Sequence, residues 1–213
     1  MPQLSKTILS LAIFAVLGLG SAITARADSF TIVGNTFPNN ATATLNITSL
    51  SNNLLCFTIT NTSSVGVVTG FGFELPGTGT YTLQSVNPAD QPGNQNFSFD
   101  TTPGNVPQFN TAVLDFALLT GNNFAGGNPQ TGIPAGATSS EFCVFSSTNS
   151  FAGLTQQQIA DAIYVRFQSL PGGESDVGHG GTIIPEPTTM LLLGTGLAGI
   201  AATVRKRRKA RRE

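Results

Sequence analysis

The chain has 213 residues, enough for one ordinary domain together with targeting segments. It contains 24 Gly, 12 Pro, 15 Phe and two Cys, and only 10% of its residues are charged, which excludes a coiled coil, a charged disordered protein and a disulfide-dense miniprotein. The formal net charge of −1 hides a segregation: residues 28–184 carry nine acids and only one base, Arg166. Nucleic acid is therefore not an expected partner, because phosphate binding needs clustered Lys or Arg.

The N-terminal residues have the pattern of a secretory signal peptide. Lys6 precedes an apolar run over residues 8–19, and Ala25 and Ala27 supply the small side chains that a signal peptidase requires. A retained membrane helix is the alternative, but the run is short for a span and the small residues follow it directly. We predict a signal peptide over residues 1–27, cleaved after Ala27.

Residues 28–170 have the alternating pattern of short, half-buried strands. Apolar and polar side chains alternate in Thr- and Phe-rich runs, and Gly, Pro and Asn separate these runs. The apolar sets are Ala43, Leu45 and Ile47; Leu55, Phe57 and Ile59; Phe71 and Phe73; Phe97 and Phe99; Leu114, Phe116 and Leu118; and Phe142 and Val144. We expect a mainly β ectodomain, an antiparallel β-sandwich.

One short helix interrupts the strand pattern. Thr155 and Gln158 have the spacing of a capping box, and an apolar stripe follows at Ile159 and Ile163. The chain then reads as extended over residues 164–168, which we expect to be the last strand. Arg166 within it is expected to face outward or to meet a carboxylate.

Cys56 and Cys143 lie within two of the expected strands. In an exported chain with an even number of cysteines, we expect them to form one disulfide. Two separate buried thiols are the alternative. A metal site is not expected, because further ligands are missing.

Residues 171–184 are rich in glycine and are predicted to form a flexible linker between the domain and the C-terminal segment. The single histidine, His179, lies in this stretch between two glycines. Since a catalytic or metal-binding histidine needs fixed partners, neither role is expected for it.

The C-terminal segment has three parts in a fixed order over residues 185–213. Pro185, Glu186 and Pro187 come first, and an uncharged run over residues 188–204 is long enough for a short transmembrane helix. A buried core helix is the alternative for that run. A basic tail over residues 205–213 is expected to stay cytoplasmic, and its charges are Arg205, Lys206, Arg207, Arg208, Lys209, Arg211 and Arg212.

The order Pro-Glu-Pro, uncharged helix and Arg-rich tail resembles the PEP-CTERM protein-sorting signal, which is also labelled as an ice-binding protein C-terminal domain. The resemblance covers residues 185–213. It implies export in a Gram-negative bacterium and recognition by an exosortase, a membrane transpeptidase that acts near the motif. Bacteria with this route often make exopolysaccharide. We carry no ice-binding activity over from the label.

The residues offer little for catalysis, so we expect no enzyme, no catalytic residue, no metal and no cofactor. Asp100, Asp115 and Glu141 could in principle meet in space for glycoside chemistry, which needs a pair of carboxylates, but no spacing in the sequence supports such a pair. The expected function is that of a non-enzymatic cell-envelope or extracellular-matrix protein. The alternative is a carbohydrate-binding module of the exopolysaccharide layer, for which Tyr81 and Tyr164 would be the stacking residues.

The expected partners and location follow from the two ends of the chain. A signal peptidase and an exosortase would process the protein, and residues 188–204 would hold the precursor in the inner membrane. The product would then reach the cell surface or the exterior, where exopolysaccharide is a further candidate partner.

Overall fold

The computed structural model describes residues 29–85 and 94–184. Within these ranges the chain forms two antiparallel sheets and one short helix, so the expected mainly β fold is confirmed to this extent. The expected signal peptide, the transmembrane helix and the basic tail lie outside the described residues.

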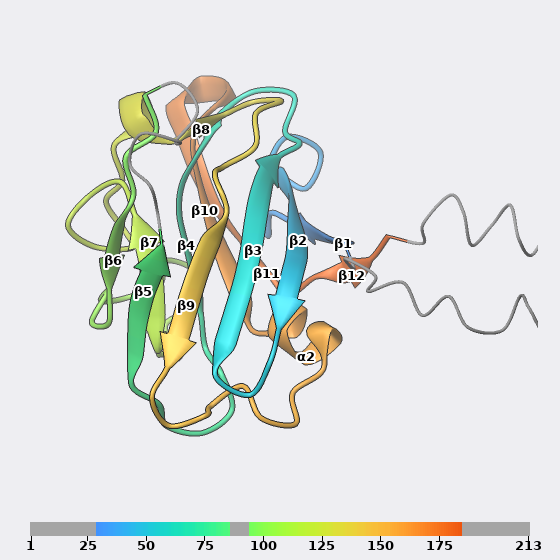
Figure 1. Ribbon diagram of the computed structural model, residues 1–213. Coiled ribbons are helices and arrows are strands. Elements are labelled where there is room, and N and C mark those ends of the chain that lie inside the picture. Colours follow the sequence, from blue (N-terminus) through green and yellow to red (C-terminus); the bar gives the residue numbers. More distant parts are fainter. Residues whose placement is uncertain (1–28, 86–93, 185–213) are drawn as a thin grey trace, which may run out of the picture.

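The first sheet, called sheet 1, brings the first and last described strands together at one edge. Along it the order is β12, β1, β2, β3, β9 and β5, and every neighbouring pair is antiparallel. Figure 1 shows β5, β9, β3 and β2 side by side at the front of the molecule. The strands are β12 (Thr182–Ile183), β1 (Ser29–Val33), β2 (Thr42–Leu50), β3 (Leu54–Asn61), β9 (Phe142–Ser146) and β5 (Tyr81–Ser85).

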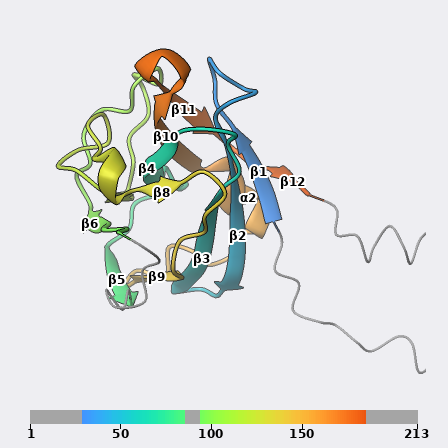
Figure 2. The same cartoon turned by 90° about the horizontal axis from the view of Figure 1, so that it is seen from above.

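The second sheet, called sheet 2, lies behind sheet 1, and Figure 2 shows the two layers from above. Its order is β11, β10, β4, β7 and β6, and the short β8 also pairs with β4. The strands are β11 (Glu174–His179), β10 (Ile163–Leu170), β4 (Val67–Phe73), β7 (Phe116–Leu119), β6 (Ser98–Asp100) and β8 (Ile133–Pro134).

Phenylalanine side chains fill the space between the sheets. Phe57 on β3 lies 5.9 Å from Phe71 and 5.2 Å from Phe73 on β4, measured between ring centroids. Phe142 on β9 joins the same cluster at 5.3 Å from Phe71. The expected inward sets on β2, β3, β4 and β9 are all fully buried, because the period of two puts every second residue on the core face.

The outer faces of the two sheets differ. The segments on either side of β7, residues 101–115 and 120–131, cover the outer face of sheet 2 and form a second apolar cluster with it, in which Val106 and Phe124 pack near Tyr164 and Val177. Leu114, expected to share a face with Phe116 and Leu118, precedes β7 and belongs to this second cluster instead. The outer face of sheet 1 carries partly exposed polar side chains: Thr31, Thr44, Asn46, Thr58 and Thr60.

The expected capping box is present at the start of α2 (Gln156–Asp161). The Thr155 side chain accepts a hydrogen bond from the backbone of Gln158, and the Gln158 side chain accepts one from the Thr155 backbone at 2.9 Å. Both bonds satisfy N–H groups that have no partner inside the helix, which explains why the helix begins here. Ile159 is fully buried against the main core.

The chain after β10 differs from the expectation. Residues 171–184 do not form a plain linker, and β10 is not the last strand, because β11 and β12 follow it. Two glycines with positive φ, Gly172 at 84° and Gly173 at 79°, make the turn from which β11 returns along β10. Gly178 lets sheet 1 approach, since a Cβ there would lie 2.7 Å from Ile32. The glycines in this stretch therefore serve tight turns and close packing.

Candidate functional site

The two ends of the described domain meet at the edge of sheet 1. Strand β12 pairs with β1 in antiparallel register, with Phe30 opposite Ile183 and Thr31 opposite Thr182. The Ile184 N–H then donates to the Ser29 carbonyl at 2.8 Å. Figure 1 shows β1 and β12 side by side, and the chain enters and leaves the domain at this one place. The expected motif at 185–187 follows Ile184 directly in the sequence.

Cys56 and Cys143 form the disulfide that the sequence analysis expects. They lie directly opposite each other on the paired strands β3 and β9, and their Cα atoms are 4.1 Å apart. A carboxylate oxygen of Glu141 lies 3.9 Å from the Cys143 sulfur. These three side chains are close enough to share a metal ion, but the disulfide bond occupies both sulfurs.

Asp100, Glu141 and Asp115 each accept a hydrogen bond from a different residue. Asp100 accepts from the Thr102 backbone at 2.8 Å, and Glu141 accepts from the Thr48 hydroxyl. Asp115 accepts from the Leu75 backbone at 2.7 Å and lines a pocket of about 450 Å³. Burial raises the pKa of Asp115 above its ordinary value, although that hydrogen bond lowers it, and the charge of Glu74 adds a smaller increase.

Both tyrosines are buried, at 4% exposure for Tyr81 and 5% for Tyr164. The Tyr164 ring stacks on the His179 imidazole at a centroid distance of 4.0 Å, and its hydroxyl donates to Glu74 at 3.0 Å. His179 Nδ1 also lies 3.1 Å from the Ile163 carbonyl, so this histidine has fixed neighbours, contrary to the linker expectation. Neither tyrosine can act as the exposed stacking platform that a carbohydrate-binding module commonly uses.

The ionisation of the tyrosines can be predicted from these surroundings. Burial, together with the hydrogen bond and the charge of Glu74, raises the pKa of Tyr164 from 10.0 to about 12, and burial also raises the pKa of Tyr81. The stability that neutral Tyr164 contributes should therefore be complete below pH 10 and lost as the pH rises towards 12.

A spectrophotometric titration of tyrosinate should show this, because the chain has two Tyr and no Trp. Tyr164→Phe should remove the step near pH 12 and leave the Tyr81 step in place. Two tyrosines that both titrate near pH 10 in the folded protein would contradict the prediction.

Arg166 lies on the outer face of sheet 2, as Tyr164 does, but this face is covered and the side chain is not exposed. Its side chain is only 7% exposed, and its terminal nitrogen donates to Ser175 Oγ at 2.9 Å and to the Ala125 carbonyl at 3.3 Å. Burial lowers the pKa of Arg166, and the nearby charge of Asp176 acts against this shift. The buried Asp176 carboxylate itself accepts hydrogen bonds from backbone N–H groups, including Phe37 at 2.7 Å. Arg166 thus ties the covering segment to sheet 2.

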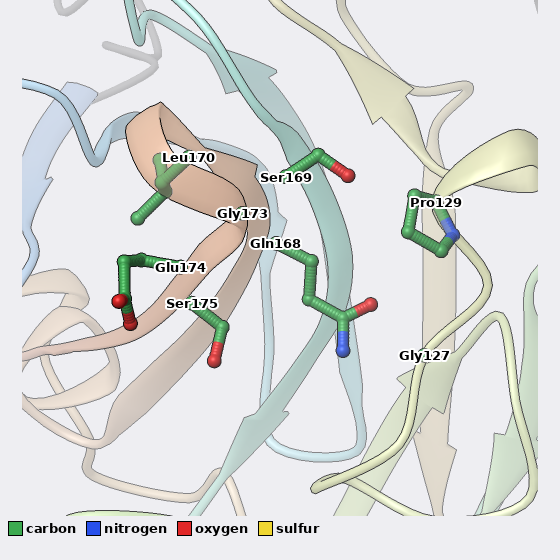
Figure 3. A pocket seen from close by; sticks show the side chains of 8 residues that line it. All are labelled: Gly127, Pro129, Gln168, Ser169, Leu170, Gly173, Glu174 and Ser175. Atoms are coloured by element: carbon green, nitrogen blue, oxygen red, sulfur yellow. The ribbon is translucent and has the colours of Figure 1, made fainter.

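A pocket of about 620 Å³ opens beside the turn between β10 and β11 (Figure 3). The Gln168 side chain extends into the space between this turn and Pro129. Its Oε1 is buried and has no hydrogen-bond partner among the described residues. The pocket is lined by Gly127, Pro129, Gln168, Ser169, Leu170, Gly173, Glu174 and Ser175. The lining is mostly uncharged and offers both donors and acceptors. No local sequence pattern indicates this pocket, because its walls come from two segments, residues 127–129 and 168–175, that are about 40 residues apart in the chain.

In the part of the chain that the structure describes, there is no helix of the length and apolar character that a bilayer crossing requires. No curated protein and no solved structure matches the chain. Residues 184–208 match the family model of the PEP-CTERM protein-sorting motif, and the match begins at the residue that is hydrogen-bonded to Ser29. The chain therefore carries a PEP-CTERM protein-sorting motif, which supports exosortase-dependent sorting of an exported protein through a membrane-anchored precursor.

Proposed function

We propose that this protein is an exported, non-enzymatic component of the cell envelope or extracellular matrix, whose precursor an exosortase cuts at Pro185–Pro187. The observation that carries the proposal is the sorting-motif match at residues 184–208, directly after the last strand of the domain. The first strand begins at Ser29, so cleavage after Ala27 would leave a single residue before it. Both proposed cuts therefore fall at the borders of the folded domain.

The polar surface supports a structural role for the domain. The outer face of sheet 1 presents four threonines and an asparagine on β1, β2 and β3, beside the partly exposed Leu54 and Phe145, so its polar part can remain hydrated or bind a hydrated polymer through hydrogen bonds. Glycoside hydrolysis needs two carboxylates at a set separation. Of the three carboxylates named from the sequence, Glu141 adjoins β9 of sheet 1, whereas Asp100 and Asp115 belong to or adjoin strands of sheet 2, so the fold gives no support to a pair that includes Glu141.

Replacing Pro185, Glu186 and Pro187 together by alanine should abolish processing when the full chain is produced with an exosortase. The precursor should accumulate in the membrane fraction, and the shorter product should disappear on an immunoblot. Val113→Ala is a matched control, because Val113 is 74% exposed and distant in sequence from the motif. Unchanged processing of the triple variant would overturn the proposed sorting.

A second candidate function, carbohydrate binding, is favoured by the pocket beside the β10–β11 turn. A rotation of the Gln168 side chain would turn its buried, unpartnered Oε1 towards the opening, where it can accept a hydrogen bond from a sugar hydroxyl, and the Ser175 hydroxyl, which already accepts from Arg166, can donate one. Pro129 offers an apolar ring for the face of a saccharide.

Glycan-array binding by the 28–184 fragment tests this candidate. We expect Gln168→Ala to weaken binding to any recognised neutral glycan by about tenfold, as for one lost hydrogen bond to a buried acceptor. Thr82→Ala, an exposed change on the other sheet, should bind as the parent does. Binding to no glycan, or binding that is indifferent to Gln168, would remove this candidate.

A further inference from the structure

The last described strand, β12, has only a short pairing with the rest of the domain. β12 contains two residues, and it pairs with β1 through two residue positions only. Thr182 is exposed, as are Ile183 at 54% and Ile184 at 39%. Short exposed edge segments of this kind open locally at a small fraction of the free energy that global unfolding requires.

The chain immediately before β12 is held much more firmly. The Gly180 N–H donates to the Ile163 carbonyl at 3.0 Å, and the Gln157 side chain donates to the Gly181 carbonyl at 2.9 Å. Gly181 also packs so closely that a Cβ there would lie 2.8 Å from the Cβ of Phe30. The boundary between the firmly held chain and the easily opened chain therefore lies between Gly181 and Thr182.

Pro185, the first residue of the Pro-Glu-Pro sequence, directly follows Ile184, whose N–H is bonded to the domain at Ser29. A protein that binds an extended peptide commonly does so through the backbone N–H and C=O groups of that peptide, and these groups must then be free. Pro185 and Pro187 have no N–H, so the nearest donor upstream of the motif is Ile184. In the folded domain this N–H is bonded to Ser29, which makes it inaccessible to an enzyme.

We propose that β12 is a detachable strand, and that an exosortase can process the motif only after β12 has left β1. This inference rests on the proposed exosortase processing and adds that the folded domain sets its rate. No residue lies between Ile184 and Pro185, so the folded domain leaves no free chain before the motif. Release of residues 182–184 from β1 supplies that extended segment. Rapid opening and closing makes the observed rate proportional to the population of the open form.

Locking β12 to β1 tests the proposal in the full chain. Thr31 and Thr182 lie directly opposite each other, so the double variant Thr31→Cys, Thr182→Cys should form a cross-strand disulfide after export. We expect processing by a co-produced exosortase to slow by about tenfold or more. The single variants Thr31→Cys and Thr182→Cys should be processed at the parent rate.

Slow processing of the locked variant could come from poor access to the motif or from misfolding, and a spacer variant distinguishes these two causes. Insertion of Gly-Ser-Gly between Ile184 and Pro185 supplies free chain, so it should restore processing of the locked variant and speed up the parent. Processing of a demonstrably cross-linked variant at the parent rate would overturn the detachable strand. If the double variant fails to fold, an unchanged rate after the spacer is inserted into the parent would overturn it as well. Absence of processing in the parent itself would instead overturn the proposed sorting and, with it, this inference.

Discussion

Removal of the Cys56–Cys143 disulfide is expected to lower the free energy of unfolding by about 4 kcal/mol. The bond closes a sequence separation of 87 residues, and in the chain-entropy treatment such a loop strongly restricts the unfolded chain. The bond also joins directly opposed residues of β3 and β9 and so favours their register. Urea unfolding of the 28–184 fragment carrying Cys56→Ala and Cys143→Ala, compared with the parent, measures the loss.

The parent under reducing conditions is the matched control, because it should show the same loss without any substitution. Thiol labelling before reduction should detect no free cysteine, since the structure shows both sulfurs in the bond. A loss below about 1 kcal/mol would mean that the loop-closure argument does not apply to this domain.

Phe57→Ala is expected to destabilise the domain by about 3–5 kcal/mol. The Phe57 ring is fully buried and lies within 6.0 Å of the Phe71, Phe73 and Phe142 ring centroids, so it connects the two sheets. Its removal forfeits the burial of a large apolar side chain and leaves a cavity that rigid neighbouring strands can fill only in part. Thermal or urea unfolding of the same fragment measures the effect.

Phe57→Leu keeps most of the apolar volume and should cost clearly less than the alanine substitution. Val113→Ala, at a largely exposed position, should change stability by less than about 0.5 kcal/mol. Equal losses for Phe57→Ala and Val113→Ala would show that the phenylalanine cluster is not the principal core.

The strand pattern was predictable because each strand buries one face. The sets that include Leu45 on β2, Phe57 on β3 and Val144 on β9 were assigned to the core from a local period of two, and all three residues are fully buried. The Thr155–Gln158 capping box was predictable for the same kind of reason, since its two hydrogen bonds lie within four consecutive residues.

The glycine-rich stretch after β10 was assigned wrongly, because composition does not distinguish a flexible glycine from one required for close contact. Gly178 and Gly181 are both positions where a Cβ would collide with neighbours on β1. The burial of Arg166 also could not be predicted from the residues next to it in the sequence. Its covering partner, the Ala125 carbonyl, lies 41 residues earlier in the chain, and only the folded arrangement brings them together.

The sequence by itself determined features that depend on near neighbours in the chain: the inward faces of β2, β3, β4 and β9, the helix cap and the sorting motif at residues 184–208. The tertiary structure decided which strands pair, that the second apolar cluster covers sheet 2, and that β12 binds β1 just before the motif. These features depend on contacts between residues far apart in sequence. Such contacts form only when many weak interactions are satisfied together, so no local pattern records them.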